Sequence, residues 1–507
     1  MQKQLDVLFV EPNSSFEAYQ ELSHIYSAIE TPTWSLLLAQ ACRSKGFSVS
    51  ILDSTAERLS IDQTVKRIHE VKPRLVVFVM YGQNPNSGTT NMIGARKLGK
   101  ALKEAYPEYP ICMVGSHVSA LPREVIRYDF VNFILLNEGV YALQNLLRTN
   151  LKDDLDKVKG IGYKAENQPI LNPPEMTVPH AKMDIDLPGY AWDLLPYKNK
   201  PFDLYRAHFW HAEFDHSKRT PFAAIYTSLG CRFACDFCMI NIINRVNNGE
   251  DIVSADSKGM RYWSPQFMLK EFEKLHSYGV ETIRISDEMF FLDKRYFEPL
   301  LTGLVERGIK PRMWAYSRID TVQPKYLDLF KKAGINWLAL GIEAANQDVR
   351  FEISKGSFKN VNIREVVKSI QDTDINIISN YIFGFPDDTL ETMQQTLDLA
   401  LELNTETANM YPCQALPGSP LHREAKKNGW KLPDSPEGYA FLSYECEPLP
   451  TKHLTAAQVL EFRDKAWNTY FSNPKYLELV ERKFGLQQRR NVEDMTKIKL
   501  KRKILGD

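Results

Sequence analysis

The sequence lacks an excess of charge of either sign, a long apolar run and a regular set of cysteines. Its 507 residues carry 63 basic and 63 acidic side chains, so the formal net charge is zero. This balance argues against a nucleic-acid partner, because nucleic-acid-binding proteins need a basic excess to displace counterions from phosphates. The longest apolar runs, such as 75–80, are far shorter than the roughly 20 residues that span a bilayer. We therefore expect no transmembrane segment.

The N-terminal stretch MQKQLDVLFVEP lacks a basic region followed by a long apolar stretch, so we expect no signal peptide. The seven cysteines are an odd number and four of them are isolated, which makes a poor disulfide framework. We expect a cytoplasmic protein with reduced thiols. A chain of this length with ordinary hydrophobic content predicts two to four domains.

Residues 1–150 alternate short apolar runs with helical patterns. Apolar strands separated by helices indicate a parallel sheet that is covered on both faces. An open, doubly wound, Rossmann-like domain of this kind binds ligands at the carboxyl ends of its strands. The expected strands are 5–12, 47–53, 74–82, 109–117 and 130–139, and the expected helices include 32–45 and 91–106.

Residues 151–220 are rich in proline and predict a linker that wraps between domains, with a small hairpin at 160–171. Residues 221–430 return to strand–helix alternation and predict a partial (β/α)6 TIM-like barrel. Its expected strands are 222–230, 282–288, 312–320, 337–344 and 376–386. Residues 431–507 predict a small helical C-terminal domain with helices at 456–471 and 474–484. The fold class is therefore α/β.

Three cysteines fall on one short loop directly after an expected strand. Cys231, Cys235 and Cys238 have the spacing C-x3-C-x2-C. Three thiolates can hold a cubane iron–sulfur cluster and leave one iron without a protein ligand. Structural zinc requires four ligands, and a redox C-x-x-C pair needs no third cysteine. The spacing therefore favours a cluster with an open iron, where a cofactor or substrate binds.

This loop resembles the signature of the radical S-adenosylmethionine (SAM) superfamily, C-x3-C-x-Φ-C, in which Phe237 is the aromatic Φ. The resemblance implies that the three cysteines hold a [4Fe–4S] cluster whose fourth iron is chelated by SAM. It also implies reductive cleavage of SAM to a 5′-deoxyadenosyl radical that abstracts hydrogen from the substrate. An electron donor such as flavodoxin or ferredoxin is then expected.

Several downstream strand ends also resemble that family. Asp287 or Glu288 stands where an acidic motif holds the SAM amino group, and Arg318 could pair with the SAM carboxylate. Glu343 belongs to a fifth-strand motif near the ribose and methionine, and Gly384 to a turn that lets backbone approach the adenine. A single position of this kind is more often a structural ion pair or turn, but the ordered spacing of all of them after the cysteine loop favours the functional interpretation.

The first 150 residues resemble the cobalamin-binding domain that precedes many radical SAM barrels. Segment 31–39 matches its first helix, 114–122 its G-G-P-H-x-S-x-x-P loop and 137–139 its E-G-E loop. The stretch 53–58 lacks the axial histidine of D-x-H-x-x-G, so no lower axial ligand is expected there. A vestigial domain without ligand is the alternative. The resemblance implies cobalamin contacts at Tyr81, Gly82, Gln83, Asn84, Gly115, Ser116, His117, Glu138 and Gly139, with His117 at the corrin edge or in a structural role.

The leading hypothesis is methylation of an unactivated carbon of a small-molecule, sugar or lipid substrate. A cobalamin-dependent radical SAM cyclase, or an oxidative or ring-rearranging enzyme, is the first alternative, and a non-catalytic iron–sulfur or corrin sensor is the second. Tyr205, His208, His211 and His216 precede the cluster strand. We interpret the histidines as exposed loop residues, with a general base or substrate contact as the alternative. Segment 409–420 is expected to contribute to specificity.

Overall fold

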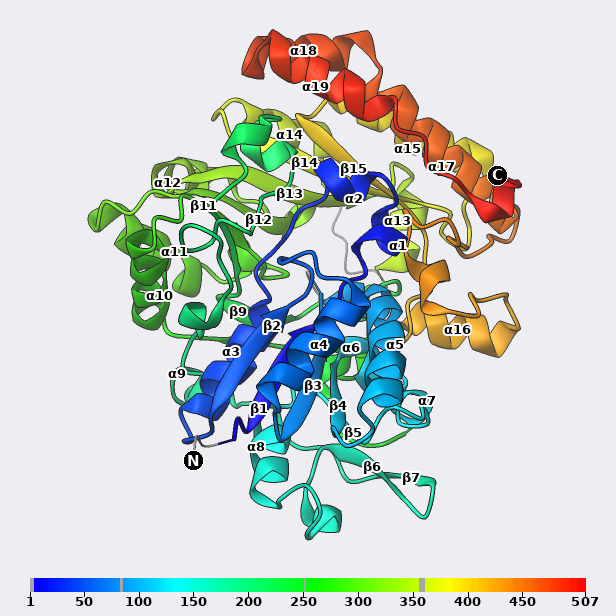
Figure 1. The fold of residues 1–507 in the computed structure, drawn as a ribbon. Coiled ribbons are helices and arrows are strands. Elements are labelled where there is room, and N and C mark those ends of the chain that lie inside the picture. The colour runs from blue at the N-terminus through cyan, green and yellow to red at the C-terminus, as the bar shows by residue number, and fades with distance from the viewer. Residues whose placement is uncertain (1–3, 83–84, 250–251, 355–360) are drawn as a thin grey trace.

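The computed structural model describes residues 4–82, 85–249, 252–354 and 361–507. The expected cobalamin contacts Gln83 and Asn84 lie outside these described residues. Two largely parallel sheets dominate the chain, and Figure 1 shows them as separate layers, the first in blue to cyan and the second in green to yellow.

The first sheet has the strand order β2-β1-β3-β4-β5-β6-β7, and β1 to β5 are parallel. Alternate residues of a strand point to opposite faces; accordingly, Val7 and Phe9 enter one apolar core, and Leu8 and Val10 enter the other. Both faces are therefore covered, as the apolar strands predict. The parallel strands are β1 Val7–Glu11, β2 Val49–Asp53, β3 Leu75–Met80, β4 Ile111–Gly115 and β5 Phe133–Leu135.

Helices cover this sheet on its two faces. Ile68 and Leu98 place α4 and α5 in the core that holds Leu8, whereas Leu37 and Leu143 place α3 and α8 in the core that holds Val7. The helices are α3 Thr33–Arg43, α4 Ile61–Val71, α5 Gly88–Ala105, α6 Ser116–Ala120, α7 Pro122–Val125 and α8 Val140–Arg148. The expected hairpin is present as β6 Ile161–Ala165 and β7 Gln168–Leu171, and it extends the first sheet at the β5 edge.

The second sheet is a curled, all-parallel half-barrel with the order β15-β14-β13-β12-β11-β8. This confirms the expected α/β class with a partial barrel. The strands are β8 Phe222–Ile225, β11 Thr282–Ile285, β12 Arg312–Arg318, β13 Ile335–Glu343, β14 Asn376–Phe383 and β15 Thr407–Pro412. The helices between them are α10 Pro265–Ser277, α11 Lys294–Glu306, α12 Leu327–Ala333, α13 Gln347–Ile353, α14 Ile363–Gln371 and α15 Leu390–Leu403.

The expected strand 222–230 is divided into two. β8 ends at Ile225, and β9 Ser228–Cys231 pairs antiparallel with β10 Gly259–Tyr262 in a separate two-stranded sheet. The chain turns at Thr227 because its backbone N–H and its hydroxyl both donate to the carboxylate of Asp287. The turn directs the cysteine loop away from the axis of β8.

The C-terminal residues form helices beside β15. The expected helices are present as α17 Ala456–Phe471 and α18 Pro474–Phe484, and α19 Leu486–Thr496 follows them. Figure 1 shows these orange and red helices along one side of the half-barrel. The remaining short helices are α1 Ser15–Tyr19, α2 Leu22–Ile25, α9 Met183–Asp186 and α16 Pro420–Asn428.

The N-terminal segment that carries α1 and α2 leaves the first sheet and reaches the second (Figure 1). Two arginines of the 201–220 stretch hold it there: Arg206 donates to the carbonyls of Ser23, His24 and Ser27, and Arg219 donates to those of Ile25, Tyr26 and Ser27. The segment therefore lies at the open side of the half-barrel, between the edges β8 and β15.

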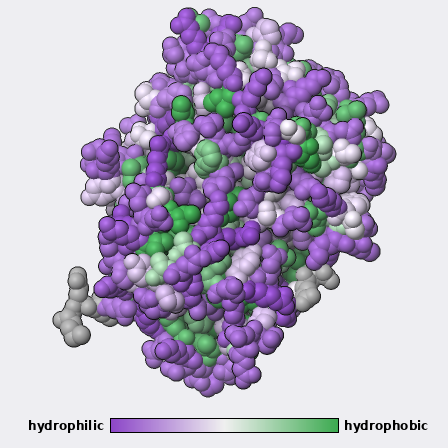
Figure 2. Space-filling view, turned by 45° about the vertical axis from the view of Figure 1, so that its right-hand side comes forward, coloured by the Kyte–Doolittle hydropathy of each residue, from purple (hydrophilic) through white to green (hydrophobic). Residues whose placement is uncertain are grey.

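Among the described residues, no helix is long and apolar enough to cross a membrane. The face in Figure 2 is mainly hydrophilic, with apolar residues in small separate patches.

Candidate active site

A cavity of about 850 Å³ lies where the two sheets meet. Its lining includes the cysteine loop, strand residues of the half-barrel, the carboxyl ends of β1 to β3, the N-terminal segment that carries α1 and α2, part of α17 and the C-terminal residues 495–500. Both parallel sheets thus present their ligand-binding ends to one shared space.

The three cysteines and Phe237 of the loop line this cavity. Cys231 ends β9, and all three thiols are half-buried and outside any disulfide. The ring of Phe237 lies 5.8 Å from that of Phe385, in a small apolar cluster that supports the loop from behind. The loop therefore presents its sulfur atoms to the cavity on an anchored backbone.

The donor set fits an iron–sulfur cluster. Within the described residues, no three metal-binding side chains converge on a single ion. A [4Fe–4S] unit does not require this, because each thiolate binds a different iron. Burial raises the pKa of Cys231 to about 11 and that of Cys235 to about 12. Without a cluster the thiols are therefore protonated, and assembly of the cluster would displace these protons.

The two adjacent acids after β11 have different surroundings. Asp287 is fully buried, and its carboxylate accepts hydrogen bonds from Thr227 and from the Ser228 hydroxyl at 2.6 Å. Glu288 lines the cavity, and its Oε1 has no partner among the described residues. Burial raises the pKa of Glu288 to about 8. Of the two expected candidates, Glu288 is therefore placed to receive an ammonium group.

Arg318 and Glu343 line the same end of the cavity. Arg318 is held by Asp320 through two hydrogen bonds of 2.6 and 2.7 Å, and its guanidinium lies 3.7 Å from the centre of the Phe233 ring. Glu343 sits at a β-bulge with a left-handed φ of 67°. Burial raises its pKa to about 7, and nearby Arg318 opposes that shift. The buried Arg318 and the half-buried Glu288 and Glu343 thus share the cavity lining with the cysteine loop.

Gly384 lies outside the cavity lining. Its φ is 87°, and a Cβ at this position would lie 2.4 Å from Cγ1 of Val459 in α17. Its backbone N–H donates to Asp388 at 3.0 Å. In this structure, the close approach of α17 is what requires glycine here.

Tyr81 and Gly82 line the cavity at the end of β3. The ring of Tyr81 stacks on Trp34 of α3 with centroids 4.3 Å apart, and its hydroxyl donates to the Asn137 carbonyl at 2.7 Å. Trp34 also lines the cavity, and its Nε1 has no partner among the described residues. A flat aromatic wall with a free donor fits a large macrocycle whose amide side chains accept hydrogen bonds.

The other expected cobalamin contacts lie outside the lining. Gly115 ends β4 beside Met80 of the neighbouring strand β3, and a Cβ at Gly115 would lie 2.3 Å from the Met80 carbonyl oxygen. The imidazole of His117 bonds to the Thr89 hydroxyl at 3.0 Å, and burial lowers its pKa to about 3. The environment of His117 is thus that of a neutral buried histidine. The buried Ser116 lies beside it.

The loop that contains Glu138 and Gly139 contacts the residues that follow the cysteine loop. Glu138 is buried and pairs with Arg261 of β10 at 2.8 Å. Gly139 has a φ of 77°, and its Cβ would lie 2.9 Å from Val114. Neighbouring Asn137 donates to the Arg245 carbonyl at 3.0 Å. This loop therefore ties the first sheet to the strands that carry the cysteine loop.

Several cavity residues were missed from the sequence, and two of them are acids at strand ends. Glu11 and Asp53 end β1 and β2 and line the cavity. Asp53 accepts from the hydroxyl of Tyr205 at 3.1 Å, and burial raises the pKa of Asp53 to about 6. Burial also raises the pKa of Glu11. Their position at the carboxyl ends of parallel strands is the signal that could have identified them.

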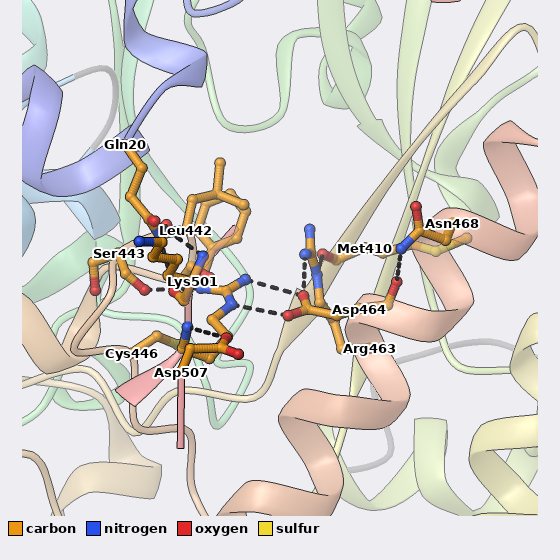
Figure 3. A network of polar contacts seen from close by, with 12 residues as sticks. Gln20, Met410, Leu442, Ser443, Cys446, Arg463, Asp464, Asn468, Lys501 and Asp507 are labelled. Carbon is orange, nitrogen blue, oxygen red and sulfur yellow. Dashed lines mark hydrogen bonds and ion pairs between the residues drawn. The ribbon is translucent and has the colours of Figure 1, made fainter. Parts of the chain in front are cut away.

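The C-terminal tail completes the cavity wall. Met495, Ile498, Lys499 and Leu500 line it, as do Asn409 and Tyr411 of β15. Part of the segment 409–420 thus faces the cavity, and its contribution to specificity stays a prediction. Figure 3 shows Arg463 and Asp464 next to Met410, and Lys501 next to Gln20. Arg463 donates to the Met410 carbonyl at 2.6 Å, and Gln20 exchanges two hydrogen bonds of 3.1 Å with Lys501. Arg502 of the tail also donates to Asp464 of α17 at 2.8 Å, so the tail is fixed to both α17 and the N-terminal segment.

Comparison with known families agrees with this arrangement. Residues 26–147 match the B12 binding domain, and residues 225–400 match the radical SAM superfamily. The chain is 26% identical over 432 residues to an uncharacterised methyltransferase of Pyrococcus horikoshii, covering 85% of each chain. It is 20% identical over 437 residues to an anaerobic magnesium-protoporphyrin IX monomethyl ester cyclase of Cereibacter sphaeroides, covering 83% of this chain and 63% of the cyclase.

The fold resembles that of the radical SAM methyltransferase TsrM from Kitasatospora setae with tryptophan and a SAM analogue bound. The TM-score is 0.67 at 16% identity, and the match covers 98% of this chain and 99% of TsrM. The chain is thus a radical SAM enzyme with an N-terminal B12-binding domain. Its cofactors are a [4Fe–4S] cluster, SAM and cobalamin.

Proposed function

We propose that this enzyme transfers a methyl group to an unactivated carbon of a small-molecule substrate. The observation that carries this proposal is the single cavity, into which the cysteine loop and the ends of β1 to β3 both open. When bound, the cluster and SAM supply a 5′-deoxyadenosyl radical, and cobalamin supplies the methyl group. One shared space lets both reagents reach the same substrate atom.

The residues of the chain divide this work among them. Cys231, Cys235 and Cys238 would hold the cluster, and Glu288 would accept a hydrogen bond from the SAM amino group. Arg318 would pair with the SAM carboxylate while Asp320 holds it in place. Trp34, Tyr81 and Gly82 would support the corrin. The aromatic and apolar part of the lining would pack against the apolar part of the substrate and hold it in place.

We also propose a division of the chain into a cobalamin-binding domain at 1–150, a linker at 151–220, the radical SAM barrel at 221–430 and a helical domain at 431–507.

An external one-electron donor such as flavodoxin or ferredoxin would reduce the cluster. The small-molecule substrate would include sugars and lipids, and the apolar part of the cavity lining favours a substrate with a large apolar part.

The test uses full-length enzyme reconstituted anaerobically with cluster and cobalamin. The enzyme is incubated with reductant, SAM carrying a deuterated methyl group and a metabolite extract, and S-adenosylhomocysteine and 5′-deoxyadenosine are then quantified. We expect both products, together with the labelled methyl group in one extract component. Cys238→Ser should abolish 5′-deoxyadenosine, and His216→Phe is the control at an exposed site. Deoxyadenosine without S-adenosylhomocysteine or label transfer would contradict methylation.

A cyclase is the second candidate, favoured by the similarity to the magnesium-protoporphyrin ester cyclase. It predicts 5′-deoxyadenosine and a modified product that carries no deuterated methyl group from SAM. A non-catalytic sensor predicts neither product, and it has no use for Glu288 or Arg318 in the cavity.

A further inference from the structure

A buried polar group lies deep inside the half-barrel, away from the cofactor-binding strand ends. Arg284 of β11 and Glu30 of the N-terminal segment form an ion pair with both carboxylate oxygens 2.5 Å from Nη1. Nε2 of His208 lies 2.9 Å from the same carboxylate. Glu30 and His208 both line the cavity.

This group is distant from the SAM end of the site. The ring of His208 lies edge-to-face with Trp314, 5.8 Å between centroids. Trp314 precedes Arg318 by four residues on β12, which corresponds to about 13 Å along a strand. His208 therefore lies beside the part of the cavity that is closer to the amino end of β12 than the expected position of the SAM carboxylate.

The hydrogen-bond roles of His208 follow from its partner. Arg284 holds the pKa of Glu30 below its ordinary value despite burial, so the Glu30 carboxylate is ionised and accepts. Nε2 therefore carries the proton and donates. Burial lowers the pKa of His208, so the ring is neutral and Nδ1 keeps its lone pair. The His208 side chain remains 24% exposed, and Nδ1 has no partner among the described residues.

The walls around this acceptor are aromatic. Trp210 stacks on the His208 ring with centroids 5.3 Å apart, and Tyr316 lies 4.8 Å from Trp314. Both line the cavity, as do Phe209 and Phe214. Trp314 also lines it, and its Nε1 has no partner among the described residues. A buried donor and an acceptor are thus left for a ligand to satisfy.

We propose that His208, positioned by Glu30, binds the substrate through Nδ1, and that the substrate is an apolar ring compound with an N–H or O–H donor. His208 is then the residue that contacts substrate, and Glu30 is a positioning residue that fixes the tautomer. This corrects the interpretation of His208 as an exposed loop residue; the same interpretation is wrong for His211, which is buried. The inference rests on the proposed function, since it places the substrate in the same cavity.

The test measures ring-compound binding directly by calorimetry, with full-length enzyme carrying cluster, cobalamin and SAM. Indole and 1-methylindole serve as probes, because the methyl group removes only the N–H donor. We expect indole to bind about fivefold more tightly, the effect of one neutral hydrogen bond. His208→Phe should equalise the two probes, and His208→Gln should restore part of the difference through its amide oxygen.

His216→Phe is the matched control, because His216 belongs to the same stretch but is exposed and outside the lining. It should keep the preference for indole. Equal binding of both probes, an unchanged preference in His208→Phe, or no saturable binding of either probe would overturn the proposal. Production of 5′-deoxyadenosine, assayed on the same samples, confirms folding. Probe preference without methyl transfer would refute the proposed function alone.

Discussion

Glu30 and Arg284 form an ion pair across the boundary between the two sheets. Arg284 is fully buried in β11, and Glu30 reaches it from the segment that precedes α3. A second donor, Nη2 of Arg284, bonds to the Tyr316 hydroxyl at 2.8 Å. This ion pair therefore helps to set the relative position of the two sheets, together with the pair of Glu138 with Arg261.

Glu30→Leu should destabilise the enzyme by about 3–5 kcal/mol, because it leaves the Arg284 charge buried without its counterion. The double variant Glu30→Leu/Arg284→Met should recover most of this loss, because it removes both charges. Denaturant unfolding of the three proteins measures the difference. Equal losses in the single and double variants would show that the pairing itself contributes little.

Glu288→Gln should weaken SAM binding about 10- to 100-fold, because a charge-assisted hydrogen bond to the SAM ammonium is lost. Asp287→Asn should instead lower the melting temperature, because an amide oxygen cannot replace the carboxylate at the Thr227 turn. Equilibrium dialysis of SAM against cluster-loaded protein separates the two effects. The reverse pattern would assign the SAM contact to Asp287.

Asp53→Asn should stabilise the protein at neutral pH. Burial raises the pKa of Asp53 from 3.8 to about 6, so the folded state binds a proton more tightly than the unfolded state. Stability from this proton is present below about pH 4 and is lost as the pH rises through 6. The variant avoids that loss, which amounts to at most about 3 kcal/mol.

Thermal unfolding at pH 7.5 and at the lowest pH where the protein stays soluble measures this effect. The advantage of Asp53→Asn should shrink as the pH falls. Asp153→Asn is the control, because Asp153 is exposed. A constant advantage at every pH would mean that Asp53 has the same pKa in the folded and unfolded states, so that its ionisation does not contribute to the difference.

Arg502→Ala should loosen the C-terminal tail. The guanidinium is buried and donates to Asp464 at 2.8 and 3.0 Å and to the carbonyls of Phe441 and Ser443. Its loss leaves these acceptors unsatisfied and should cost about 3–5 kcal/mol locally. Limited proteolysis should then cleave the tail faster than in Lys503→Ala, whose side chain is exposed. Equal cleavage rates would show that other contacts hold the tail.

Much of the fold could be predicted because the strands are apolar and the helices are periodic. β15 was not predicted, since Thr407–Pro412 contains Asn409 and ends in proline and so lacks a strand-like pattern. The break after β8 was not predicted either, because it depends on Asp287, which lies 60 residues further along the chain.

The candidate site was predictable where one short motif determines it, as at Cys231, Cys235 and Cys238. It was less predictable where side-chain direction decides, as between Asp287 and Glu288. Glu30 was missed because nothing near it in the sequence indicates that its partner is Arg284, 254 residues away. Contacts of this separation become visible only once the sheets are assembled.

The pairing of Gln20 with Lys501 has a consequence for biosynthesis. These residues are 481 positions apart, and they join the two segments that close the open side of the half-barrel. Because the chain emerges from the ribosome from its N-terminus, both sheets can form while this wall is still missing. The cofactor chamber therefore stays open to the surrounding solution throughout most of translation, and it is sealed only after residue 501 has been released.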